Sequence, residues 1–137
     1  AGDYTVFGTE GLTDGLNTEQ LVIIHIEGVL GLENLDEIIG VPGLDVIFLG
    51  PYDLSQSFGI PGQVNDPRVV QGMEQAVRKI RAAGKAAGTF AADTRTAQQW
   101  IDAGVQYLSL SVDVGIFAAA CRNLVAEVKG VTPGRRA

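Results

Sequence analysis

One alternation runs through the chain: a short apolar run is followed by a longer mixed segment, four times in 137 residues. The runs cover residues 21–27, 45–49, 85–90 and 106–111. Apolar runs of this length, bounded by turn residues, favour buried strands, although the third run is rich in Ala and Gly. Strands that alternate with helices pair in parallel, so the pattern predicts an α/β fold of parallel βα units.

The segments between the runs predict helices. Residues 28–40 place apolar side chains on one helical face and end at a Val-Pro-Gly stop. Residues 67–83 begin with Pro67 after Asp66, a favourable first residue and a favourable cap. Residues 52–66 are expected to form a long loop. In the helix over 67–83, the side chains expected to face inward are Val70, Met73, Ala76, Val77 and Ile80.

Two further helices are expected near the C-terminal end, over residues 95–103 and from residue 113 to about residue 128. Residues 1–20 are expected to form an irregular lead-in, residues 21–130 four βα units, and residues 131–137 a flexible tail. A complete (β/α)8 barrel needs roughly 250 residues. The length therefore suits about half of such a barrel.

Charge and composition exclude several classes of protein. The net charge of −6 argues against nucleic acid or an anionic membrane surface as the main partner. No apolar run approaches the length of a membrane-spanning helix. The first residues lack the basic and apolar parts of a signal peptide, and a single cysteine rules out an internal disulfide framework. We expect a cytoplasmic protein with no membrane partner.

An acidic residue follows each predicted strand closely: Glu27, Asp53, Asp93 and Asp113. In parallel α/β proteins, catalytic and ligand-binding residues lie at the C-terminal ends of the strands. A helix begins directly at Asp93 and at Asp113, so a capping role is the simpler interpretation for those two.

Glu27 ends a strand that is otherwise almost wholly apolar. Because side chains alternate along a strand, His25 and Glu27 share one face with Leu21 and Ile23, while the other face is uniformly apolar and is expected to pack against helices. A buried carboxylate on the first face must be paired, protonated or metal-bound. The spacing alone leaves a salt bridge at the rim of a barrel as an equal alternative.

Asp53 lies in the segment Gly50-Pro51-Tyr52-Asp53, directly after the second apolar run. Gly and Pro there predict a tight turn whose backbone N–H groups form an anion-binding nest. Two carboxylates from adjacent strands make an oxygen-rich site with positions left for water or substrate, which suits Mg²⁺ or Mn²⁺.

Other reactive residue types carry weaker expectations. His25, the only histidine, is expected to be a lumen residue rather than a metal ligand. Lys85 starts a strand rather than ending one, which favours a solvated or structural role over a Schiff base. Cys121 is expected in the core. Ser109 and Ser111 are candidates for lining the lumen, but no base is evident near them.

Two stretches of the sequence resemble the HpcH/HpaI family of class II pyruvate aldolases. The first is LVIIHIEGVLGLENLDEIIGVPGLDVIFLGPYDLSQSFGIPGQ and the second is GKAAGTFAADTRTAQQWIDAGVQYLSLSVD. The resemblance implies that Glu27 and Asp53 are the ligands of a divalent metal ion, Mg²⁺, Mn²⁺ or Co²⁺. It also implies that the backbone of Gly50, Pro51, Tyr52 and Asp53 holds the pyruvate carboxylate.

The chain departs from the family pattern at His25, where the family commonly has a glutamine that helps to hold pyruvate. His25 is therefore expected to contact the substrate. It is also the one candidate here for a substitute catalytic base. The family's first four βα units, which carry an enolate-stabilising arginine and a histidine–aspartate pair for proton transfer, have no counterpart in these residues. The chain is thus similar to units five to eight of a TIM barrel.

The resemblance implies reversible, metal-dependent retro-aldol cleavage of 4-hydroxy-2-oxo acids to pyruvate and an aldehyde. The metal would act as a Lewis acid that stabilises the enolate. We expect activity to need a complementary N-terminal half-barrel or a homo-oligomer. The alternative is a non-catalytic, self-associating half-barrel that retains only metal and 2-oxo-acid binding.

Overall fold

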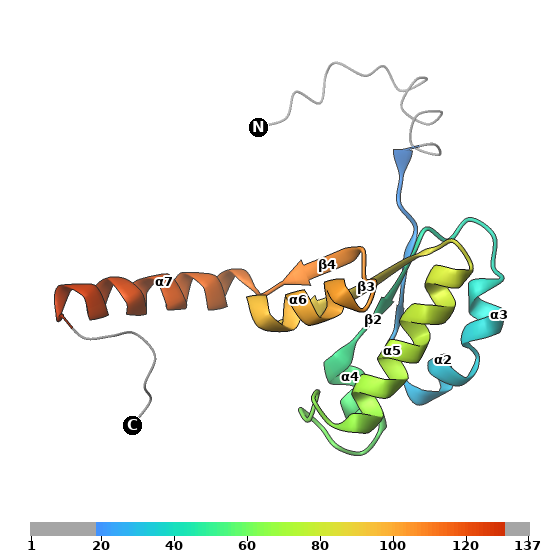
Figure 1. Cartoon of the computed structure of the whole chain (residues 1–137), viewed down its shortest axis with the longest axis horizontal. Helices are drawn as coiled ribbons and strands as arrows, with labels where there is room; N and C mark the ends of the chain where they lie inside the picture. Colours follow the sequence, from blue (N-terminus) through green and yellow to red (C-terminus); the bar gives the residue numbers. More distant parts are fainter. Residues whose placement is uncertain (1–18, 131–137) are drawn as a thin grey trace.

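A computed structural model of the chain describes residues 19–130, and these form a four-stranded parallel sheet in the order β1-β2-β3-β4 (Figure 1). The strands are β1 (Ile23–Ile26), β2 (Val46–Leu49), β3 (Ala86–Ala91) and β4 (Tyr107–Leu110). The helices are α2 (Val29–Glu33), α3 (Leu35–Ile39), α4 (Pro51–Ser57), α5 (Pro67–Ala82), α6 (Thr94–Asp102) and α7 (Asp113–Val128). Four parallel βα units were predicted, and the parallel α/β fold is confirmed.

The core lies between one face of the sheet and the helices beside it. Ile26, Ile47 and Leu49 project from the strands and are almost fully buried against α5 and its neighbours. Figure 1 shows α2, α3 and α5 gathered on that side of β1 and β2. The uniformly apolar face of the first strand thus packs against helices, as its alternation predicted.

The open face of the sheet carries a row of register partners across all four strands, with an aromatic ring on β1, β2 and β4. His25, Phe48, Gly88 and Tyr107 are partners in the parallel register. The rings of His25 and Phe48 stack with centroids 4.6 Å apart, and Tyr107 meets Phe48 edge to face. A Cβ at Gly88 would lie 2.9 Å from the Phe48 ring, so Gly88 leaves the room that Phe48 occupies.

Two predicted details of the helices are wrong, and one is incomplete. Residues 28–40 form two short helices, α2 and α3, that meet at Asn34, rather than one helix. In α5 the prediction omitted Val69, which is fully buried; Val70 is partly buried and packs against the core, and the other four predicted inward residues are buried. At the start of α7 the cap position is Val112, and Asp113 is the first helical residue, accepting a hydrogen bond from the Val114 N–H at 2.7 Å.

The predicted loop over residues 52–66 is also wrong, because α4 occupies its first part. Gly50 is the cap residue of α4, and Pro51 takes the first helical position, where a missing N–H costs nothing. Leu54 is fully buried beneath the helix. The tight turn expected at residues 50–53 is therefore the first turn of α4.

Two predicted caps are present. The Asp66 carboxylate accepts from the Arg68 N–H at 2.9 Å, and the Asp93 carboxylate accepts from the Thr96 N–H at 2.8 Å. The pKa of Asp93 lies below its ordinary value because the Thr96 backbone N–H stabilises the charged form. Asp93 is thereby engaged at the start of α6.

Helix α7 extends away from the sheet and buries no residue within the described part of the chain (Figure 1). Cys121 was predicted to lie in the core and is instead exposed on this helix. Lys85 has the expected structural role, since its ammonium group donates to the carbonyls of Val41 and Leu44 at 3.3 and 2.9 Å. The predicted tail over 131–137 and most of the predicted lead-in over 1–20 lie outside the described residues.

Candidate active site

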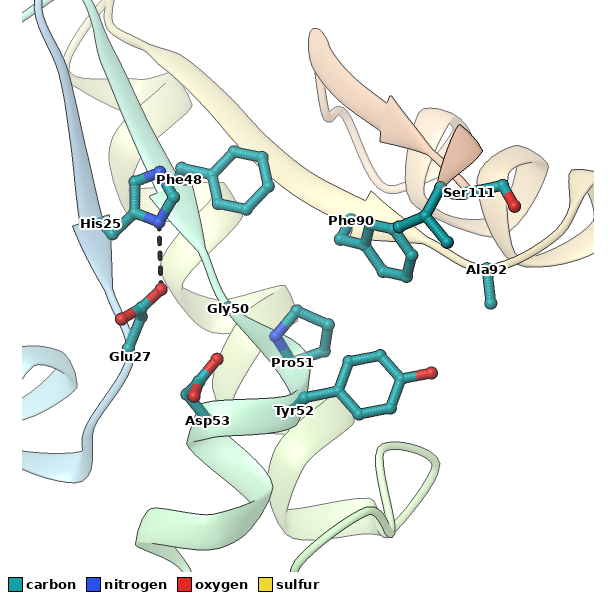
Figure 2. A pocket seen from close by; sticks show the side chains of 11 residues that line it. His25, Glu27, Phe48, Gly50, Pro51, Tyr52, Asp53, Phe90, Ala92 and Ser111 are labelled. Carbon is teal, nitrogen blue, oxygen red and sulfur yellow. Dashed lines mark hydrogen bonds and ion pairs between the residues drawn. The ribbon is translucent and has the colours of Figure 1, made fainter. Parts of the chain in front are cut away.

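A pocket of about 440 Å³ opens at the C-terminal ends of the strands (Figure 2). We call it the acidic pocket. All six residues predicted for the site line it, and so do five others. The predicted residues are His25, Glu27, Gly50, Pro51, Tyr52 and Asp53; the others are Phe48, Phe90, Ala92, Ser111 and Val112.

Glu27 and Asp53 approach each other across Gly50. Glu27 follows β1 directly, and Asp53 lies in the first turn of α4, just after β2. A Cβ built on Gly50 would be 3.3 Å from Glu27 Oε1 and 3.5 Å from Asp53 Oδ2. Figure 2 shows the two carboxylates on the same side of the pocket. The parallel pairing of β1 with β2 therefore brings both acids to one small volume.

Gly50 makes this approach feasible. Its backbone, with φ −90° and ψ 100°, suits any residue, so no conformational demand explains the glycine. A side chain would instead meet Glu27, because the Cβ would be 2.9 Å from Glu27 Cγ. The missing side chain leaves room for the Glu27 carboxylate beside the start of α4.

His25 is oriented by two contacts. Its Nδ1 lies 3.0 Å from Glu27 Oε1, and its ring stacks on Phe48. About half of each side chain in the His25–Glu27 pair is exposed, 52% and 49%. His25 thus faces the open side of the sheet beside Glu27, as the strand alternation predicted. The rim salt bridge that the spacing left open exists if His25 is protonated.

The opposite wall of the acidic pocket is aromatic. Phe90 projects from β3, and the Tyr52 ring meets it edge to face with centroids 6.0 Å apart. Phe48 and Phe90 were not predicted for the site. Phe48 lies two residues before Gly50, which follows β2, and Phe90 lies two residues before Ala92, which follows β3. Strand alternation places such residues on the same face as the site, and that signal was available.

Ser111 also reaches the pocket, from the end of β4. It is the one non-glycine residue with positive φ in the part of the chain that the structure describes, at 57°. Ser109, its companion in the predicted lumen-facing pair, does not line the pocket. Asp93 and Asp113 likewise lie outside the lining set, which agrees with their engagement near helix starts.

The carboxylates of Glu27 and Asp53 suit a hard divalent cation that keeps coordination positions open for other ligands. Mg²⁺ is usually held by one or two carboxylates together with water and substrate oxygens. Glu27 and Asp53 supply two such carboxylates. Across residues 19–130 no group of three or more His, Cys, Asp or Glu side chains is arranged to hold a metal. The positions that two carboxylates leave open on such an ion suit water and substrate oxygens.

The family model described as HpcH/HpaI aldolase/citrate lyase matches residues 5–120. The chain belongs to the HpcH/HpaI aldolase/citrate lyase family. The resemblance that the two sequence stretches carried is thus confirmed.

Two relatives with curated names are aldolases. The chain is 44% identical over 113 residues to a hydroxypyruvate/pyruvate aldolase of Deinococcus radiodurans, which covers 82% of this chain and 41% of the relative. It is 40% identical over 113 residues to a 2-keto-3-deoxy-L-rhamnonate aldolase of Klebsiella pneumoniae, covering 82% and 42%. The chain therefore spans less than half the length of these relatives.

A solved structure gives the same proportion. An HpcH/HpaI aldolase/citrate lyase family protein from Burkholderia cenocepacia superposes with a TM-score of 0.79 at 34% identity, covering 82% of this chain and 44% of that one. The four parallel units correspond to part of this family's TIM-barrel fold. None of the helices in residues 19–130 is long and apolar enough to cross a membrane.

Proposed function

We propose that this chain contributes the metal and 2-oxo-acid site of a divalent-metal-dependent pyruvate aldolase. The observation that carries the proposal is the approach of the Glu27 and Asp53 carboxylates across Gly50, in a pocket at the C-terminal ends of parallel strands. Membership of an aldolase/lyase family supports it. The proposed reaction is reversible cleavage of 4-hydroxy-2-oxo acids to pyruvate and an aldehyde.

Each site residue has a role in this proposal. Glu27 and Asp53 hold Mg²⁺, Mn²⁺ or Co²⁺, which supplies a Lewis acid for the 2-oxo acid when bound. The N–H groups at the start of α4, at Tyr52 and Asp53, have no carbonyl within their own helix to bond, because the first turn lacks such partners. They are suited to the substrate carboxylate. His25 lies beside Glu27 and contacts the substrate.

The bond changes define what else the reaction needs. The bond between C3 and C4 breaks, the C4 hydroxyl loses its proton as C4 becomes the aldehyde carbon, and C3 gains a proton to give the pyruvate methyl group. A base must take the first proton and an acid must supply the second. His25 is the only histidine of the chain and is hydrogen-bonded to Glu27. Because His25 is engaged with Glu27, we assign both proton transfers to residues of a complementary N-terminal half-barrel.

Complementation tests this proposal. The full chain is assayed with Mn²⁺ on 4-hydroxy-2-oxopentanoate, alone and together with the N-terminal part of the Deinococcus radiodurans aldolase that lies outside the match. Released pyruvate is measured. General acid–base groups contribute about 10²–10⁴-fold and an oxyanion donor about 10²–10³-fold, so the chain alone should turn over roughly 10⁴-fold more slowly than the complex.

Variants of the full chain complete the test. Asp53→Ala should abolish the activity of the complex without unfolding the chain, because the side chain is exposed rather than part of the core. Full-rate turnover by the chain alone that is lost in His25→Ala would instead identify His25 as the base. Activity of the complex that survives Asp53→Ala would overturn the metal site. A folded but inactive complex would favour the non-catalytic, self-associating half-barrel.

A further inference from the structure

A second pocket adjoins the acidic pocket on the far side of the Tyr52 ring. It has a volume of about 190 Å³, and we call it the side pocket. Its walls come from α6 and from the connection between α4 and α5, and they include Thr96 and Trp100. Pro51, Tyr52, Phe90 and Ala92 line both pockets. The two cavities therefore meet along a short shared boundary.

The Tyr52 side chain is one of the four that form this boundary. Tyr52 immediately precedes Asp53 on α4, and its side chain points away from the two carboxylates toward Phe90 and Ala92 (Figure 2). It meets the Phe90 ring edge to face at 6.0 Å and 61° between ring planes, a favourable aromatic geometry. Phe90 belongs to β3 and Ala92 directly follows it, so the ring rests on a fixed support.

We propose that Tyr52 sets the size limit for the part of the substrate beyond its 2-oxo-acid end. This rests on the proposed function, because it takes Glu27 and Asp53 as the point where the 2-oxo acid is held. From that point the substrate chain crosses the acidic pocket toward the aromatic wall. There the Tyr52 ring closes the way into the side pocket.

The side pocket is large enough to hold a ring-sized group, so the effect of opening it on ligand affinity can be measured. An apolar cavity of about 150 Å³ accommodates benzene. The side pocket exceeds that volume, and its lining joins apolar side chains, among them Val70, Phe90 and Trp100, to the polar side chains of Asn65, Asp93, Thr96 and Gln99. Truncating Tyr52 removes only a half-exposed ring, 48% accessible, from a helix whose buried residues are Pro51, Leu54 and Ser55. Tyr52→Ala should therefore join the two pockets without unfolding the chain.

The test compares two inert ligands by calorimetry on the full chain with Mn²⁺. Pyruvate reports the 2-oxo-acid site, and 4-phenyl-2-oxobutanoate carries a phenyl group toward the aromatic wall. In Tyr52→Ala the affinity for the phenyl ligand relative to pyruvate should rise by about tenfold, since burying a ring-sized apolar group is worth at least that factor. Tyr52→Phe keeps the ring and should keep the wild-type ratio.

A second substitution checks that the gain comes from the side pocket. Thr96→Trp, introduced into Tyr52→Ala, should fill that pocket and return the ratio to the wild-type value. An unchanged or lower ratio in Tyr52→Ala, with pyruvate still bound, would overturn this inference alone. Failure of the unmutated chain to bind pyruvate with Mn²⁺ would overturn the proposed function as well.

Discussion

At the scale of single residues, Gly50 determines how closely the two acids approach. Its backbone conformation is available to any residue, so its role is steric. The Glu27 side chain occupies the space that a Cβ would need, with Cγ at 2.9 Å and Oε1 at 3.3 Å. A glycine after an apolar strand can thus mark a close approach of side chains rather than a turn.

Gly50→Ala should weaken Mn²⁺ binding by about tenfold or more and lower the free energy of unfolding by only about 1 kcal/mol, because alanine is a poorer helix cap than glycine. The new methyl group displaces the half-exposed Glu27 carboxylate, which can swing toward solvent. Changes that misplace a ligand commonly cost 10–100-fold in metal affinity. Titration calorimetry measures the affinity.

The control is Gly72→Ala, in α5. Gly59→Ala is less suitable, because the φ of Gly59 is +75°. Equal Mn²⁺ affinity in Gly50→Ala and wild type would contradict this role.

The sequence predicted the acidic half of the site better than the aromatic half. Glu27 and His25 share a face because a strand alternates strictly, and Asp53 follows the next strand, so their meeting follows from parallel pairing. Tyr52 was expected to act through its backbone alone. The contact of its ring with Phe90 depends on how α4 is placed beside β3, and spacing along the chain does not contain that information.

At the scale of elements, α4 is held by a buried serine. Ser55 is fully buried, donates its hydroxyl hydrogen to the Tyr52 carbonyl at 2.6 Å and accepts from the Gly62 N–H at 2.9 Å. These bonds tie the first turn of the helix, which carries Asp53, to the connection that follows it.

Ser55→Ala should lower the free energy of unfolding by about 1–3 kcal/mol, because it removes both hydrogen bonds of a fully buried side chain. Equilibrium denaturation in urea measures this. Ser57→Ala is the matched control: Ser57 accepts from the Val29 N–H at 3.0 Å on the surface, where water can replace it, so its loss should be smaller. Equal losses in the two variants would show that Ser55 does not have this special role.

The sequence predicted helices correctly where apolar residues recur at helical spacing. The long α5 and the α6 helix follow from apolar spacing and from Asp66 and Asp93 at their starts. The short α4 is not predicted by the sequence pattern, because Gly, Pro and Ser dominate its beginning and end and favour a loop. Its stability comes from tertiary contacts, namely buried Leu54 and Ser55, which composition does not reveal.

At the scale of the whole molecule, the described part leaves much apolar surface uncovered. Helix α7 carries six large apolar side chains that are more than half exposed, and strand β1 begins beside exposed Leu21 and Val22. An apolar surface of this extent marks an interaction site in soluble proteins, and the outer edge of β1 adds unpaired backbone groups. The sequence of α7 did not predict this exposure, because its pattern is typical of an ordinary, partly buried helix.

The isolated chain should therefore self-associate rather than remain a monomer. Sedimentation velocity over a tenfold concentration range should show a mass above 14.4 kDa that rises with concentration. Phe117→Asp places a charge on the apolar surface of α7, where Phe117 is 70% exposed, and should shift the population toward monomer. A compact monomer at all concentrations would contradict this expectation.

Glu27 and Asp53 together are expected to hold one divalent cation. Anomalous diffraction from crystals of the full chain grown with Mn²⁺ tests it directly. We predict one strong anomalous peak in the acidic pocket, with a carboxylate oxygen of Glu27 and one of Asp53 each at about 2.0–2.2 Å. A peak that is bonded to neither carboxylate, or a pocket without a peak in crystals saturated with Mn²⁺, would contradict the account.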